Sequence, residues 1–165
     1  MCLYSETKEC RVAEEPITVY KYVAKKYKIL DGAHRGERVN INALRDMRDK
    51  SAKTKSVFVG PYYPSASVAY LVGETVKDDN FQAVAREKYC NVLGPEFTVD
   101  YGLHTFKYQK DADMRAKDFV SIDYETAVLR CTIPAGARYY EGDVEYCSDT
   151  LVVEEVLTEY VSPDI

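Results

Sequence analysis

Alternation of apolar and polar residues predicts several short β-strands along the chain. The alternating runs are rich in β-branched and aromatic residues and are bounded by turn-forming residues. The strand candidates, in chain order, are 2–4, 16–23, 28–30, 56–60, 68–72, 126–133, 138–140 and 149–157. The run 126–133 gives the clearest signal, and the turn sequence Pro-Ala-Gly that follows ends it.

Apolar residues at helical spacing predict two or three short helices. The spacing occurs in 78–89 and in 111–119, where Asp111 provides a cap, and 42–50 offers a third candidate. Strands outnumber helices and do not alternate with them regularly. We therefore expect an α+β fold with a mainly antiparallel mixed sheet. A chain of 165 residues fits a single domain spanning 1–165.

The composition is that of a globular protein, with 46% hydrophobic and 30% charged residues. No run of 18 apolar residues is present, and the first ten residues lack a basic segment followed by an apolar one. These features predict a protein that has no membrane span and stays in the cytoplasm.

The net charge of −5 is unevenly distributed along the chain. Residues 1–60 contain 13 Lys and Arg against 8 Asp and Glu, whereas residues 61–165 contain 9 against 19. This balance argues against a nucleic-acid polymer as partner, because neutralising such a backbone takes a dense basic face. A small anionic ligand, which needs one or two cations, is compatible with it. A solvated surface on which opposite charges of the two halves of the chain pair with each other also explains the uneven charge.

The cysteines and histidines predict neither a metal site nor a catalytic centre. Five cysteines stand at wide spacings without a Cys-x-x-Cys pair, so we expect reduced thiols, and with two histidines they match no zinc pattern. Cys2 would become the first residue after removal of Met1. However, Leu3 follows it where glutamine amidotransferases have glycine, so we assign no catalytic residue and expect no cofactor.

Tyrosine is the most distinctive component, with 15 Tyr against 5 Phe and no Trp. Arg138 stands beside Tyr139 and Tyr140 between two glycines, and this combination suits a nucleotide whose base stacks and whose phosphate binds arginine. An edge strand whose tyrosines pack, and whose arginine pairs with Glu141 or Asp143, is the alternative.

His104 follows the bend at Gly102 and can donate to a phosphate or act as an acid or base. A core histidine bonded to backbone is equally typical there. Lys21, on the apolar face of 16–23, either extends to the edge or points into a pocket. The candidate ligand-binding residues are Tyr20, Lys21, Tyr62, Tyr63, His104, Thr105, Arg138, Tyr139, Tyr140 and Ser148.

Several segments resemble short accessory proteins of tailed bacteriophages. They are the opening 1–4, the segments 19–21 and 102–106, and the run 133–142 followed by 148–153. Proteins of that kind include inhibitors of bacterial immunity, some of which sequester nucleotide second messengers such as cyclic GMP-AMP. The resemblance therefore implies a sponge that binds a cyclic dinucleotide without turnover. A homo-oligomer could build its pockets across an interface.

Two alternatives remain open. The order of Tyr20-Lys21, His104-Thr105-Phe106 and an acidic final strand is similar to ADP-ribosyltransferases, but the Ser-Thr-Ser and Glu-x-Glu motifs of that family are absent. An inactive descendant of such a transferase that still binds a nucleotide would have a similar sequence. The other alternative is a protein-binding inhibitor that uses the acidic C-terminal half of the chain.

Overall fold

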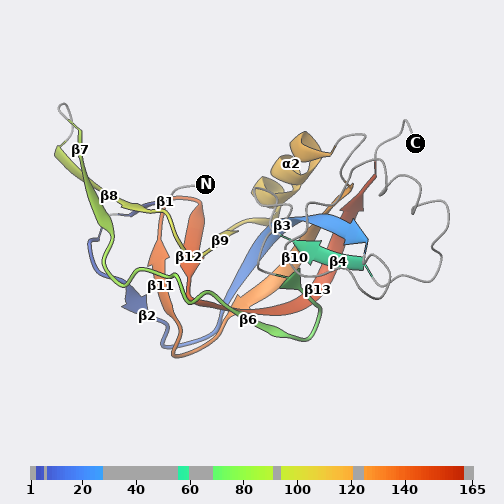
Figure 1. The fold of residues 1–165 in the computed structure, drawn as a ribbon, viewed down its shortest axis with the longest axis horizontal. Helices are drawn as coiled ribbons and strands as arrows, with labels where there is room; N and C mark the ends of the chain where they lie inside the picture. The colour runs from blue at the N-terminus through green and yellow to red at the C-terminus, as the bar shows by residue number, and fades with distance from the viewer. Residues whose placement is uncertain are drawn as a thin grey trace.

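The structure is a computed structural model, and it describes residues 3–5, 7–27, 56–59, 69–90, 94–120 and 125–161 (Figure 1). The predicted strand 28–30, the predicted helix 42–50, and Cys2, Tyr62 and Tyr63 lie outside these residues. Within the described ranges, no helix is both long and apolar enough to cross a membrane.

The described residues are mostly β-structure, arranged in two antiparallel sheets. The strands are β1 (Leu3–Ser5), β2 (Arg11–Val12), β3 (Ile17–Tyr27), β4 (Ser56–Val59), β5 (Ala69–Tyr70), β6 (Thr75–Lys77), β7 (Arg86–Cys90), β8 (Gly94–Val99), β9 (Leu103–Phe106), β10 (Glu125–Ile133), β11 (Arg138–Glu141), β12 (Glu145–Ser148) and β13 (Thr150–Tyr160). One helix, α2 (Gln109–Phe119), lies among them. The predicted α+β class with two or three short helices is therefore wrong.

The segment 78–89 accounts for much of that error. Residues 78–80 form a turn in which the Asp78 carboxylate accepts a hydrogen bond from the Asn80 amide at 2.8 Å, and β7 begins at Arg86. Phe81 and Ala85 are buried, as a helix would require, but they reach the core from an extended chain. Spacing of three and four residues does not distinguish these two arrangements.

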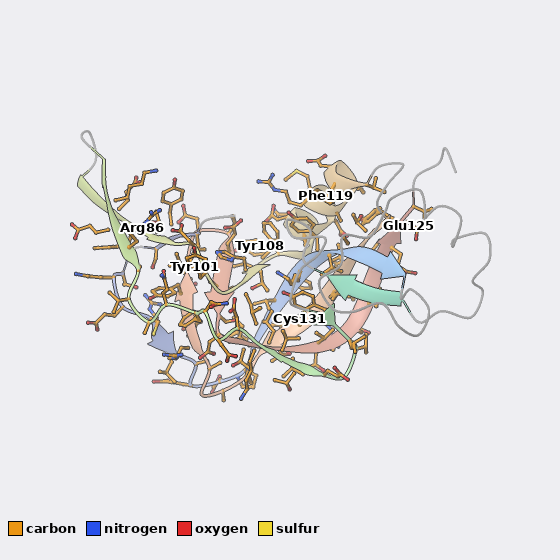
Figure 2. All side chains as sticks on the ribbon, viewed as in Figure 1. Arg86, Tyr101, Tyr108, Phe119, Glu125 and Cys131 are labelled. Atoms are coloured by element: carbon orange, nitrogen blue, oxygen red, sulfur yellow. The ribbon has the colours of Figure 1, made fainter. Side chains whose placement is uncertain are left out.

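The larger sheet has ten strands: eight follow the order β2-β11-β12-β9-β3-β10-β13-β6, β4 pairs with β3, and β5 pairs with β4 (Figure 1). Strand β10 lies between β3 and β13 and is covered on both faces. One face packs on a core that includes Val19, Leu129 and Leu151. Cys131, labelled in Figure 2, belongs to this core. Burial on both faces explains why β10 gave the clearest signal in the sequence.

Helix α2 covers the other face of β3 and β10. Its buried Ala112 and Ala116 pack against Tyr22 and Val128, and these small residues allow the helix to lie close to the sheet. The Thr126 hydroxyl on β10 donates a hydrogen bond of 2.8 Å to the Ala116 carbonyl. This helix confirms the helix predicted over 111–119 and begins two residues earlier, so the prediction of Asp111 as its cap is wrong: Asp111 lies in the first turn, and Tyr108 is the cap residue.

The smaller sheet has the order β1-β8-β7 and stands at the β11–β12 end of the large sheet (Figure 1). A second core joins the two sheets, in which Leu3 and Val99 meet Phe81, Tyr140 and Cys147. The polypeptide passes from the small sheet to the large one between β8 and β9, so the turn at residues 100–102 lies at the junction.

The large sheet is joined between β3 and β9 by a single residue pair, Tyr20 with Phe106. By contrast, β3 and β10 pair at nine positions, from Lys25–Glu125 to Ile17–Ile133. A side chain reinforces the short junction, because the Lys21 ammonium donates to the His104 carbonyl at 2.7 Å. We call this junction the seam.

Candidate ligand-binding face

Strands β2, β11, β12 and β9 lie side by side, and alternation sends their residues to two opposite faces. One face, which we call the open face, carries the cross-strand rows Arg11, Tyr139, Ser148, Leu103 and Glu141, Tyr146, Thr105. The other, the packed face, points toward the small sheet and carries the row Tyr140, Cys147, His104.

A tyrosine–cation cluster forms on the open face from Arg11, Lys107, Tyr139, Glu141 and Tyr146. The Glu141 carboxylate lies between two cations, 3.2 Å from an Arg11 guanidinium nitrogen and 2.8 Å from the Lys107 ammonium. The Tyr146 hydroxyl donates to the same carboxylate at 3.4 Å. Tyr139 and Tyr146 meet edge to face at 6.0 Å, and the Lys107 ammonium lies 5.2 Å from the Tyr146 ring centre.

The charged groups of the cluster shift one another's proton affinity. The hydrogen bond from Lys107 lowers the pKa of the Glu141 carboxyl. Partial burial acts to lower the pKa of Lys107, but its bond to Glu141 raises it overall. Burial, reinforced by the Glu141 charge, raises the pKa of the Tyr146 hydroxyl. At neutral pH the cluster therefore holds two cations around one carboxylate, with a neutral phenol beside them.

The cluster remains accessible from solvent. Half of the Arg11 side chain (52%) and a third of the Glu141 side chain (34%) are exposed, and both tyrosines are half-buried. Accessible rings beside cations are the groups that bind a planar, phosphorylated ligand.

The packed face holds polar groups of a different character. The His104 ring places Nε2 3.1 Å from the Val99 carbonyl and Nδ1 3.2 Å from the Gly102 carbonyl, so its N–H anchors the junction turn. Cys147 Sγ lies 4.0 Å from Nδ1. Burial lowers the pKa of His104 to about 4 and raises that of the Cys147 thiol. A neutral thiol beside a neutral imidazole is not an activated nucleophile.

The structure divides the predicted site residues between the two faces. Lys21, Thr105 and Ser148 share the open face with Tyr139 but are buried more deeply, and the Ser148 hydroxyl donates to the Thr150 carbonyl at 3.0 Å. Of the predicted residues that the structure describes, Tyr139 alone belongs to the cluster.

The remaining described candidates, Tyr20, His104, Arg138 and Tyr140, lie on the opposite face. Arg138 is exposed and pairs with Asp149 at 3.0 Å rather than with Glu141 or Asp143. The Tyr140 hydroxyl is used inside the protein, where it donates to the Gln82 carbonyl at 2.7 Å.

Sequence reasoning missed Arg11, Lys107, Glu141 and Tyr146 as site residues. Part of the signal was present, because alternation along 138–141 already separates Tyr139 and Glu141 from Arg138 and Tyr140. The contribution of Arg11 depends on the pairing of β2 with β11, which no local pattern encodes.

Within the described residues, no group of three or more His, Cys, Asp and Glu lies together in a way that could hold a metal ion. Comparison with protein-family models, with curated proteins and with solved structures finds no match to this chain.

Proposed function

We propose that this protein binds a small phosphorylated nucleotide at the tyrosine–cation cluster and holds it without chemical change. The observation that carries the proposal is the position of the Glu141 carboxylate between Arg11 and Lys107, beside two half-buried tyrosine rings. That carboxylate occupies the place where an anionic ligand would bind. A competing ligand must therefore offer more negative charge than one carboxylate, as a phosphate does.

The cluster supplies both kinds of contact that a nucleotide needs. Arginine binds phosphate through two parallel N–H donors, and lysine adds a compact charge. Tyr139 and Tyr146 present ring surface to a base, and stacking contributes roughly 1 to 3 kcal/mol per base. The neutral His104–Cys147 pair faces away from the cluster, which favours binding over turnover there.

The resemblance to phage accessory proteins selects the first ligand to test. In that setting, a protein made in the host cytoplasm would sequester a cyclic dinucleotide such as cyclic GMP-AMP and so suppress an immune signal. Retention of an intact second messenger requires affinity alone, and the cluster offers contacts for affinity.

Calorimetric titration with cyclic dinucleotides, ADP-ribose and NAD tests this proposal. We expect Lys107→Met to weaken binding of the preferred ligand about 10- to 100-fold, because a charge-assisted phosphate contact is lost. Arg138→Ala is the matched control, since it removes a cation from the packed face of the same strands, and its affinity should stay within about twofold of the native value.

Recovery of the ligand after denaturation separates binding from catalysis. Intact nucleotide supports sequestration, whereas a modified nucleotide would support a transferase. The proposal is overturned if no member of the panel binds at micromolar concentration, or if Lys107→Met and Arg138→Ala have equal effects.

A protein-binding inhibitor is the second candidate, and the small sheet favours it. Tyr4 on β1 and Tyr101, two residues after β8, are more than half exposed, at 56% and 55%, and the exposed Arg86 side chain on β7 pairs with Asp100 at 3.0 Å (Figure 2). Tyrosine and arginine are the residues that most often dominate protein interfaces. If the nucleotide panel fails, loss of partner capture in a Tyr4→Ala, Tyr101→Ala double variant would support this function.

A further inference from the structure

The seam contains an ammonium group that no carboxylate of the described residues neutralises. Lys21 is buried, with 8% of the residue exposed, and within the described part of the chain no Asp or Glu lies at ion-pair distance from it. One of its three N–H donors meets the His104 carbonyl at 2.7 Å, and its nitrogen lies 5.2 Å from the Tyr70 ring centre. A buried charge without a counter-charge is strongly unfavourable.

A hydroxyl without a hydrogen-bond partner among the described residues lies opposite this ammonium. The pairing of Tyr20 with Phe106 places Lys21 across from Thr105 in the antiparallel register, and both side chains point to the same face. Thr105 is fully buried, and among the described residues its Oγ1 has no hydrogen-bond partner. Buried hydroxyls are nearly always bonded, so an orphan of this kind indicates a missing partner.

We propose that a small inorganic monoanion, with chloride as the physiological example, binds at the seam between the Lys21 ammonium and the Thr105 hydroxyl. Both groups can donate hydrogen bonds, and the register places them side by side on one face, so an acceptor could bind to both. The single positive charge matches one negative charge. Because both side chains are buried, the site accepts a small ion rather than an extended ligand.

The charge state of Lys21 supports this assignment. Burial lowers its pKa to about 8, which still leaves the amine mostly protonated at pH 7. The positive charge of Lys21 also contributes to the low pKa of His104, after burial. An anion at the seam would offset that charge, so its binding should raise the pKa of His104 as well as stabilise the fold.

Equilibrium unfolding at constant ionic strength, with isethionate replaced stepwise by chloride, tests the proposal. In the native chain, chloride at ten times its dissociation constant should raise the folding equilibrium constant about tenfold. Lys21→Met should abolish this response. Broadening of the ³⁵Cl resonance by the folded native protein, reversed by bromide, provides a direct readout that does not depend on the stability of any variant.

Thr105→Val distinguishes an anion from a bridging water molecule. Without chloride, the valine should be neutral or stabilising, since it removes an unpaired hydroxyl. With saturating chloride it should become destabilising relative to the native chain, because a donor to the anion is lost. Thr126→Val is the control: it loses a bond to Ala116, so its effect should not depend on chloride.

Equal chloride responses in the native chain and Lys21→Met, or no ³⁵Cl broadening, would overturn the proposal. A Thr105→Val effect that is the same with and without chloride would do so as well, and would assign the site to water. None of these measurements involves a nucleotide, so failure of the seam site and failure of the tyrosine–cation cluster can be told apart.

Discussion

The open and packed faces of strands β9, β12 and β11 use similar residue types for opposite purposes. On the open face, tyrosines and charged groups form a half-exposed cluster around Glu141. On the packed face, Tyr140, Cys147 and His104 bond to main-chain carbonyls and join the two sheets. The groups near solvent keep their charges, whereas the buried groups become neutral. On these strands the partly exposed cluster therefore keeps the charges that an anionic nucleotide needs, whereas the buried His104 and Cys147 are neutral.

The largest effect is expected from crowding the packed face. Gly102 has φ of +136°, and a Cβ added there would lie 2.5 Å from Cys147 Sγ and 3.0 Å from the Phe81 ring. Gly102→Ala should therefore lower the free energy of unfolding by about 3 to 4 kcal/mol, measured by denaturant titration.

Gly73→Ala is the control for that substitution. Gly73 also has positive φ, at +86°, but nothing lies within 4 Å of its added Cβ, so a cost of about 1 kcal/mol is expected. Equal losses in the two variants would show that backbone strain, and not packing against Cys147, sets the requirement for glycine at 102.

Acid should destabilise the packed face through His104. The pKa of this group falls from an ordinary 6.5 to about 4 on folding, so between these pH values the unfolded chain binds more protons. Stability should fall by about 3 kcal/mol as pH drops from 6.5 to 4, and should not depend on His104 above pH 7.

The His104 contribution is isolated by comparison with His104→Gln across this pH range. Glu141 also loses stabilising interactions in acid, since its pKa is lowered in the folded protein, but that loss is common to both proteins. A constant difference between the two proteins from pH 4 to 7 would contradict the assignment.

A smaller effect should separate two adjacent tyrosines. Tyr140→Phe removes the partly buried hydrogen bond to the Gln82 carbonyl and should cost about 1 kcal/mol of unfolding free energy. Tyr139→Phe should change it by less than about 0.5 kcal/mol, because the half-buried Tyr139 contributes its ring rather than its hydroxyl. Thermal unfolding of both variants measures these two changes in stability and so compares the packed face with the open face.

The smallest effect is expected from a substitution on the open face that changes nucleotide affinity. Glu141→Gln keeps the shape of the side chain but removes the carboxylate that competes for Arg11 and Lys107. We expect the variant to bind an anionic nucleotide about three- to tenfold more tightly than the native chain, with a stability loss of less than about 1 kcal/mol. Weaker binding would mean that Glu141 positions the cations rather than competing for them.

Local sequence patterns predicted individual strands and helices better than they predicted which strands pair with one another. The strand at 126–133 and the helix at 111–119 were identified correctly, because their buried residues follow a period that the sequence displays directly. The helix expected over 78–89 was wrong because Phe81 and Ala85 are buried by the second core and not by a helix face.

The candidate site was only partly predictable for the same reason. Alternation fixes which residues of 138–141 share a face, but it does not reveal that β2 pairs with β11, or that β12 lies between β11 and β9. Those pairings bring Arg11 and Lys107 to Glu141 from positions 130 and 34 residues away along the chain. Such long-range contacts arise from the topology, and a single sequence does not show them.

The seam also determines where the large sheet should open first. A sheet joined at one position by a single residue pair resists separation far less than one joined along nine, so β9 should part from β3 well before β10 does. Brief openings of this kind would let an ion enter or leave the interior while the β3–β10–β13 ladder stays intact. In deuterated water, amide hydrogens that bond β9 to β3 should therefore exchange earlier than those that bond β10 to β3.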